Sequence, residues 1–187
     1  MLQHEASAND TSTKGNVTMK TPIHPETRIG HVHLKVSNLD RALDFYVEIL
    51  GFEITQRYGS QAAFISAGGY HHHIGLNTWE SLGGSPPAPG TTGLYHTAIL
   101  YPTRAALADA LLRVEKADIK LDGASDHGVS EALYLRDPDQ NGVELYWDRP
   151  KESWPYDAEG NLNMYTRRLD LNDLRSEIES KVKKEDK

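Results

Sequence analysis

Alternating apolar and polar residues predict short strands, and two longer stretches show the spacing of an amphipathic helix. Residues 29–37 alternate, which indicates a strand with one buried face. Residues 39–50 carry apolar side chains at helical spacing, so we expect a helix that Asn38 caps and Gly51 ends. Three short strands are expected to follow, up to about residue 80.

The same pattern returns in the second half of the chain. A strand is expected over residues 93–101, then a helix over 104–116 that Thr103 caps, then strands that end near Trp147. Residues 83–90 are rich in glycine and proline and have no period, so they link the halves. The repeat predicts an α+β fold of paired βαβββ modules, in which a curved mixed sheet forms a metal-binding cavity and the helices lie outside.

These signals divide the chain into three parts. Residues 28–150 are expected to form one domain, with modules at about 29–82 and 92–150. Residues 1–27 are polar and without period, which is typical of a flexible tail. Residues 151–187 form a C-terminal extension, interpreted as a docking or oligomer element. One face of a short helix there carries Leu169, Leu171, Leu174 and Ile178.

Three candidate metal ligands follow from the strand pattern. His31 and His96 occupy the same place in the first strand of each module, and Glu144 lies in the last strand of the second. A curved sheet with outer helices would aim all three at one concave surface. Two histidines and one carboxylate, with coordination positions left open, are the ligand set of non-haem Fe(II) oxygenases.

Composition excludes several other functions. The chain has 187 residues, a net charge of −7 and no cysteine, so disulfides, thiolate metal sites and a cysteine nucleophile are excluded. The negative charge argues against nucleic acid as a partner. No apolar run approaches the ~20 residues of a membrane span, and the N-terminus does not look like a signal peptide, so no membrane partner and a cytoplasmic location are expected.

The second half also carries a family resemblance. The most specific part is the run GASDHGVSEALYLRDPD at residues 123–139, which closes on GVELY at 142–146. About residues 28–155 resemble the vicinal-oxygen-chelate superfamily, which includes glyoxalases, bleomycin resistance proteins and extradiol dioxygenases. Within it the chain is most similar to single-domain catechol-2,3-dioxygenase-like proteins.

This resemblance implies a function and its cofactors. The chain would be an extradiol ring-cleaving dioxygenase of aromatic catabolism, acting with O2 on a catechol-like aromatic diol. The metal would be Fe(II), with Mn(II) as the alternative, and its ligands would be His31, His96 and Glu144. A homo-oligomer, dimer or higher, is implied, with modules paired either within one chain or across protomers.

The same resemblance implies three catalytic side chains. His72 would act as the acid–base group beside bound dioxygen. Tyr134 has the spacing to Glu144 of the family's active-site tyrosine, and His127 resembles the histidine that contacts the substrate hydroxyl.

Further residues are interpreted as the substrate pocket. His33 and Tyr146 share the strand faces of the predicted ligands and would form pocket walls. In the run of three histidines, strand alternation alone places His73 on the face of Gly75, whereas the resemblance favours His72. His73 is therefore also a pocket candidate.

Gly75 separates the dioxygenase from its rivals. The repeat aligns Gly75 with Glu144, and glyoxalase I commonly has a glutamate there as a fourth protein ligand. Glycine offers no ligand, so coordination positions stay open for a diol and dioxygen. The alternatives are a glyoxalase-like metal-dependent lyase or isomerase, and a drug-binding resistance protein, against which the three predicted ligands argue.

Overall fold

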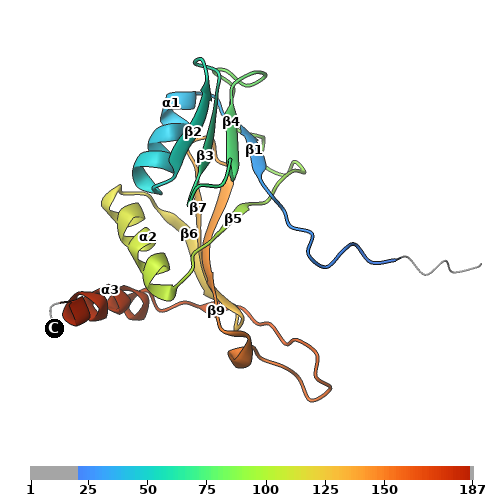
Figure 1. The fold of residues 1–187 in the computed structure, drawn as a ribbon, viewed down its shortest axis with the longest axis vertical. Helices are drawn as coiled ribbons and strands as arrows, with labels where there is room; N and C mark the ends of the chain where they lie inside the picture. Colours follow the sequence, from blue (N-terminus) through green and yellow to red (C-terminus); the bar gives the residue numbers. More distant parts are fainter. Residues whose placement is uncertain (1–20, 186–187) are drawn as a thin grey trace, which may run out of the picture.

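The computed structural model describes residues 21–185, so most of the expected tail at 1–27 lies outside the described residues. Two modules follow one another, each with a sheet and a helix against it (Figure 1). The first module consists of β1 (Val32–Lys35), α1 (Leu39–Leu43), η1 (Asp44–Ile49), β2 (Glu53–Tyr58), β3 (Ala62–Ser66) and β4 (Ile74–Asn77). The second consists of β5 (Thr97–Leu100), α2 (Arg104–Lys116), β6 (Leu121–Asp126), β7 (Ser130–Arg136) and β8 (Gly142–Asp148).

Both modules have the same topology. The first sheet has the order β1-β4-β3-β2, and the second has the order β5-β8-β7-β6 with β9 (Arg167–Arg168) added at its edge. In each module the first strand pairs in parallel with the last, and the remaining pairs are antiparallel. The prediction of an α+β fold made of two βαβββ modules is therefore confirmed.

Local capping explains where the helices begin. The side chain of Asn38 accepts a hydrogen bond from the backbone nitrogen of Arg41 at 3.0 Å, and Thr103 does the same for Ala106 at 3.1 Å. The second helix has its predicted bounds. The first continues from α1 into the wider π-helical turns of η1, and Gly51 follows with a φ of +89° that favours glycine.

The first strand of each module is shorter than expected. β1 begins at Val32 rather than at 29, and β5 begins at Thr97 rather than at 93. The segments before them expose Ile29 at 92% and Tyr95 at 78%, and the sheets pair neither residue. His31 and His96 thus each lie one residue before a paired strand, at matching positions of the repeat.

The two modules share one hydrophobic core and a polar seam. Apolar side chains of both helices and both sheets form a single buried cluster. At its edge the hydroxyl of Tyr46, on η1, donates to Asp137 Oδ2 at 3.0 Å, and Arg41 forms an ion pair with Asp139 at 2.6 Å. The turn between β7 and β8 is therefore fixed to the helix of the other module.

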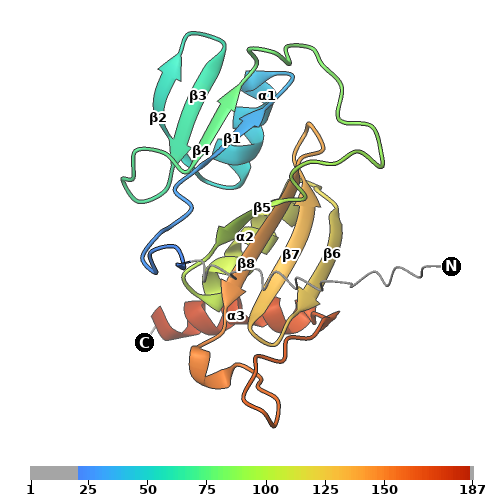
Figure 2. The same ribbon diagram turned by 90° about the vertical axis from the view of Figure 1, so that its right-hand side faces the viewer.

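The C-terminal extension folds back on the second module. Residues 167–168 add β9 to the edge of β6, and α3 (Leu171–Glu185) packs against α2 (Figure 2). Leu169 and Leu174 are buried there, so part of the predicted apolar face docks within the chain. Within residues 21–185 no helix is both long and apolar enough to cross a membrane.

Candidate metal and substrate site

Strand register makes the repeat comparable residue by residue. His33 of β1 pairs with Gly75 of β4, and Ala98 of β5 pairs with Glu144 of β8. Gly75 therefore occupies the position of Glu144, as the sequence alignment of the halves predicts. Ala98, a small residue, occupies the position of His33.

Four of the predicted site residues form a chain of polar contacts in the second module, two of them hydrogen bonds and one an ion-pair contact. His96 Nε2 lies 2.9 Å from Glu144 Oε2, and the Tyr134 hydroxyl lies 3.1 Å from Glu144 Oε1. His127 Nε2 lies 2.8 Å from the same hydroxyl. The chain runs His127–Tyr134–Glu144–His96. The side chains of His96 and Glu144 are 30% and 13% exposed, so a ligand from solvent can still reach them.

Sheet pairing places these side chains on one face. Tyr134 on β7 is the cross-strand partner of Glu144 on β8, which brings phenol and carboxylate together. His127 lies in the tight turn from β6 to β7, where its backbone nitrogen bonds Ser130 O at 2.9 Å. Asp126 closes this turn by accepting from the nitrogen of Gly128 at 2.8 Å, and Gly128 has a φ of +79°.

Gly142 allows the close approach that places His96. A Cβ atom at this position would lie 2.0 Å from the backbone oxygen of Tyr95 and 3.1 Å from the Cα of His96. Both atoms are backbone and cannot rotate away. The start of β8 therefore fixes the segment that carries His96 directly beside Glu144.

The protonation state of Tyr134 decides which groups donate and which accept in its two hydrogen bonds. Burial, followed by the negative charge of Glu144, raises the pKa of Tyr134 to about 12. The phenol therefore keeps its proton near neutral pH and donates a hydrogen bond to the carboxylate of Glu144. Its oxygen is then an acceptor, and His127 is the donor through Nε2.

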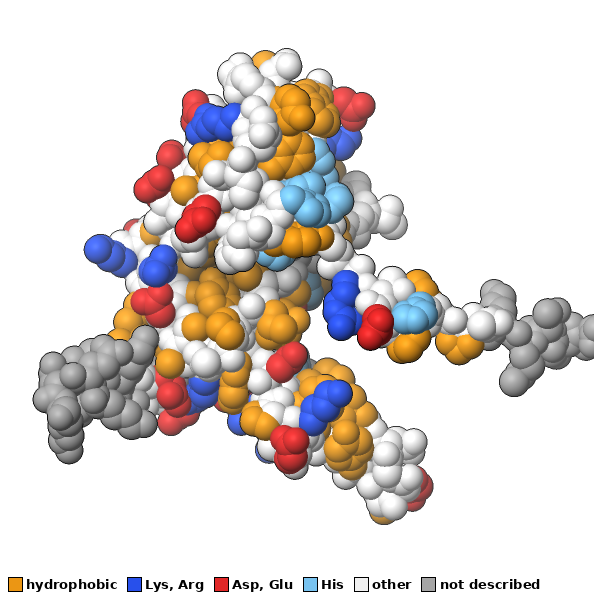
Figure 3. Space-filling view, viewed as in Figure 1, with side chains coloured by type: hydrophobic (Ala, Val, Ile, Leu, Met, Phe, Trp, Pro, Cys, Tyr) orange, Lys and Arg blue, Asp and Glu red, His pale blue; other side chains and the backbone are white. Residues whose placement is uncertain are grey.

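The first module carries a separate group of histidines. The rings of His31 and His72 lie 4.3 Å apart, and the Nδ1 atoms of His71 and His72 are separated by 2.7 Å. Histidines cover part of the surface on this module (Figure 3). Burial, then the charges of His31 and the neighbouring histidines, lowers the pKa of His72. His72 thus lies beside the predicted ligand His31.

His73 points elsewhere than His72. Its Nδ1 lies 3.0 Å from Ser66 Oγ and accepts from the nitrogen of Ala67 at 3.3 Å. His72 contacts Phe64 as well as His31, with a ring distance of 4.9 Å. Of the two histidines that the sequence left open, His72 is therefore the one on the side of His31.

His33 fills the space above Gly75. Its ring packs edge-on against Phe64 at 5.7 Å and lies 5.5 Å from Trp79. A Cβ at Gly75 would lie 2.9 Å from ring atoms of His33. Burial, followed by the charge of His31, lowers the pKa of His33. A fourth protein ligand at position 75 would require this ring to move.

The histidine group of the first module and the His96–Glu144 pair of the second do not form one metal site within this protein chain. Over the described part of the sequence, no three histidine, aspartate or glutamate side chains lie close enough together to hold one metal ion. His96 and Glu144 are in contact, whereas the ring of His31 lies against the ring of His72 in the other module, tilted by 47°. Tyr146 is half-buried on the face of β8 that carries Glu144. Metal ligation by His31, His96 and Glu144 stays a prediction.

The contact between His96 and Glu144 fits a metal site. Two neighbouring ligands of an octahedral ion, each about 2.1 Å from it, lie about 3 Å apart. The observed distance between His96 Nε2 and Glu144 Oε2 is 2.9 Å. His96 Nδ1 is buried, so Nε2 is the nitrogen that faces the site. An imidazole and a carboxylate suit Fe(II) or Mn(II).

Sequence reasoning missed two partners of His127. Its Nδ1 lies 3.2 Å from the backbone oxygen of Tyr165 and 3.2 Å from Thr166 Oγ1. Both residues belong to the C-terminal extension, which is interpreted from the sequence as a docking or oligomer element. The separation of 39 residues between His127 and Thr166 leaves no local signal in the sequence.

Comparison with known proteins supports the resemblance seen in the sequence. The chain is 42% identical over 158 residues to catechol-2,3-dioxygenase of Bacillus subtilis, covering 84% of this chain and 54% of that protein. It is 34% identical to biphenyl-2,3-diol 1,2-dioxygenase 3 of Rhodococcus globerulus, covering 69% of each. The chain thus spans about half the length of the Bacillus protein.

Solved structures agree on the fold. The crystal structure of lactoylglutathione lyase from Agrobacterium tumefaciens matches with a TM-score of 0.52 and 24% identity, covering 66% of this chain and 96% of that one. At this identity the likeness concerns the fold alone. Residues 28–145 match the Glyoxalase/Bleomycin resistance protein/Dioxygenase superfamily, and the chain belongs to this family.

Proposed function

We propose that the protein is a metal-dependent extradiol dioxygenase that cleaves a catechol-like aromatic diol with O2. The observation that carries the proposal is the chain His127–Tyr134–Glu144–His96, which joins two candidate ligands to two proton-handling side chains. Gly75 adds support because it offers no side chain that could serve as a fourth protein ligand. The names of the relatives from Bacillus and Rhodococcus favour the same reaction class.

His31, His96 and Glu144 would hold the metal, Fe(II) or alternatively Mn(II). When bound, the metal would supply the redox chemistry and the positive charge that favours an anionic diol. The proposal requires His31 to reach the other two ligands, either by a different placement of the modules or from a second copy of the chain. His72 would accompany His31 because the two rings are in contact, with 4.3 Å between their centroids.

The protein side chains would control protons. Tyr134 keeps its proton near neutral pH and would turn its hydrogen bond from Glu144 to an anionic substrate oxygen nearby. His127 would give or take a proton at Nε2, directly at substrate or through the Tyr134 hydroxyl. His33, Tyr146 and His73 remain proposals for the pocket, although His73 faces Ser66 here.

The experiment is oxygen uptake by protein loaded anaerobically with Fe(II) and then mixed with a panel of catechols. We expect oxygen consumption and a yellow ring-opened product near neutral pH. The His96→Ala variant, treated in the same way, is the control for metal that is bound elsewhere. Bound metal without oxygen uptake on any diol, together with turnover of a glutathione hemithioacetal, would instead assign the protein as a lyase.

A further inference from the structure

The C-terminal extension reaches the site through His127. We infer that Thr166 is a positioning residue that fixes which ring nitrogen of His127 carries the proton. Its effect on turnover rests on the proposed function, whereas its effect on the ring does not. The inference deepens the role of the extension, because a segment outside the two modules would then set the direction of the hydrogen-bonded chain.

The contacts of His127 leave one neutral form compatible with its surroundings. The Tyr134 hydroxyl donates to Glu144, which as a carboxylate can only accept, so the Tyr134 oxygen accepts from His127 and Nε2 carries a proton. In a neutral ring Nδ1 is then an acceptor. Of its two neighbours at 3.2 Å, only the hydroxyl of Thr166 is able to donate, because the other is the carbonyl of Tyr165.

The same pair of neighbours serves the charged ring. When His127 gains a second proton, Nδ1 becomes a donor and the carbonyl of Tyr165 accepts from it without any movement of the backbone. Thr166 then needs only to rotate its hydroxyl. The ring therefore changes its protonation state while Nε2 continues to face Tyr134.

Backbone pairing holds this segment against the turn. The nitrogen of Tyr165 donates to the carbonyl of His127 at 3.3 Å, and β9 pairs Arg167 with Asp126. A Cβ at Gly128 would lie 2.7 Å from the Tyr165 ring, so the aromatic ring closes directly over the turn. The guanidinium of Arg167 covers the Tyr165 ring at 4.2 Å.

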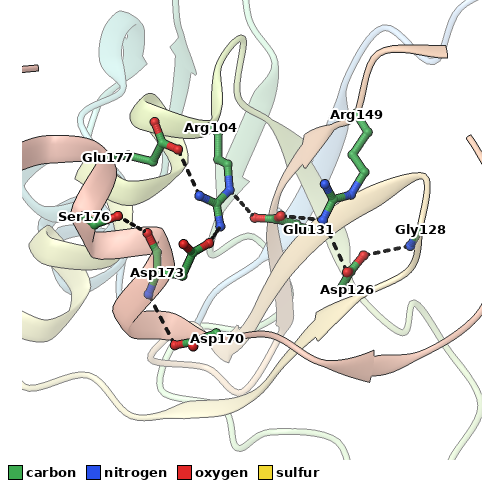
Figure 4. A network of polar contacts seen from close by, with 9 residues as sticks. All are labelled: Arg104, Asp126, Gly128, Glu131, Arg149, Asp170, Asp173, Ser176 and Glu177. Atoms are coloured by element: carbon green, nitrogen blue, oxygen red, sulfur yellow. Dashed lines mark hydrogen bonds and ion pairs between the residues drawn. The ribbon is translucent and has the colours of Figure 1, made fainter. Parts of the chain in front are cut away.

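An ionic network around the buried Glu131 ties the same turn to α3. Arg104 bonds Glu131 at 2.7 Å and also reaches Asp173 on α3 at 2.6 Å (Figure 4). Arg149 joins Glu131 at 2.6 Å to Asp126 at 3.2 Å, next to His127. The helix that follows Thr166 is thus fixed to the strands that flank His127, so the position of Thr166 is defined from both sides.

Replacing Thr166 by valine should reverse the donor and acceptor roles in the hydrogen bond between His127 and Tyr134. Valine keeps the shape but removes the only neighbour that donates to Nδ1 in the described structure. The neutral form of His127 with its proton on Nδ1 then becomes the more stable one, because the carbonyl of Tyr165 accepts a hydrogen bond from Nδ1. The deprotonated Nε2 would then accept a hydrogen bond from the Tyr134 hydroxyl. Glu144 Oε1 would lose that hydroxyl as its donor.

The test is the tautomer of His127, measured by nuclear magnetic resonance on the metal-free full chain labelled with ¹⁵N in histidine. The spectra are recorded at about pH 9, above the ordinary histidine pKa of ~6.5, and the His127→Gln variant assigns the signals. We expect the proton on Nε2 in the wild type, on Nδ1 in Thr166→Val, and again on Nε2 in Thr166→Ser, which keeps a hydroxyl. Thr91→Val, in the linker, is the matched control and should leave the wild-type signals unchanged.

A wild-type ring with the proton on Nδ1, or a Thr166→Val ring identical to the wild type, would overturn the inference. Turnover provides the second readout. We expect kcat to fall about tenfold to a hundredfold in Thr166→Val with KM within about twofold, and Thr166→Ser to restore it. If no diol is turned over, the proposed function fails. The tautomer measurement still tests whether Thr166 fixes which nitrogen of His127 carries the proton.

Discussion

At the scale of single residues, the two modules differ at the positions where chemistry is expected. The first module places His33, Gly75 and Phe64 where the second has Ala98, Glu144 and Tyr134. The first set is filled by an imidazole ring that packs on an aromatic side chain. The second set offers a carboxylate and a phenol beside a small side chain.

Removing His96 should weaken metal binding. His96→Ala deletes the nitrogen that lies 2.9 Å from Glu144, and we expect Fe(II) affinity to fall at least about a hundredfold. Metal content after dialysis, measured by elemental analysis, checks this. His24→Ala, at an exposed position, should retain the metal of the wild type. Full metal retention by His96→Ala would contradict the ligand assignment.

Replacing Tyr134 by phenylalanine should separate proton control from metal binding. Phe64 occupies the matching position of the first module, so the strand accommodates this side chain. The variant loses the donor to Glu144 Oε1, and we expect kcat to fall about tenfold to a hundredfold while metal content stays unchanged. Steady-state kinetics and metal analysis of the same sample measure both. An unchanged kcat would assign Tyr134 a structural role only.

At the scale of elements, the local signals were sufficient where the structure is local. The caps Asn38 and Thr103 and the bounds of α2 follow from side chains within a few residues of each other. The strand starts were overextended because the segments before Val32 and Thr97 have no partner strand, which alternation alone does not reveal. The contact of Thr166 with His127 depends on the path of a whole extension.

A glycine in β8 should be essential for the placement of His96. In Gly142→Ala the new Cβ would meet the backbone oxygen of Tyr95 at 2.0 Å, so β5 must shift away from β8. We expect a loss of about 2 kcal/mol or more in the free energy of unfolding, together with weaker metal binding. Urea denaturation and metal analysis test this. Gly123→Ala on β6, where a Cβ meets nothing within 4 Å, should stay within about 1 kcal/mol of the wild type.

At the scale of the whole molecule, the relative placement of the modules decides how much of the site a single chain contains. His96 and Glu144 could be grouped from strand alternation because they lie at neighbouring strands of one sheet, whereas Tyr134 and His127 were added through the family resemblance. The position of His31 depends on how one sheet sits against the other. No strand period encodes that relation, and in this structure the histidine lies with its own module.

The polar seam between the modules should contribute measurably to stability. Tyr46 is fully buried and its hydroxyl donates to Asp137, and burial raises the pKa of that carboxyl. Tyr46→Phe removes one donor from a buried acceptor, and we expect a loss of about 1–3 kcal/mol in urea denaturation. Tyr58→Phe, at a side chain that is 60% exposed, should change stability by less than about 0.5 kcal/mol. Equal effects of the two changes would argue against the seam.

The ring of His33 above Gly75 also bears on how the duplicated halves diverge. An acidic side chain that arises at position 75 by a single mutation would collide with that ring at about the Cβ distance of 2.9 Å. A symmetric arrangement with one carboxylate from each half therefore requires the His33 ring to turn out of this space, or a smaller residue at position 33. The packing of His33 on Phe64 would be lost in the first case, so the present side chains favour a protein with a single acidic half.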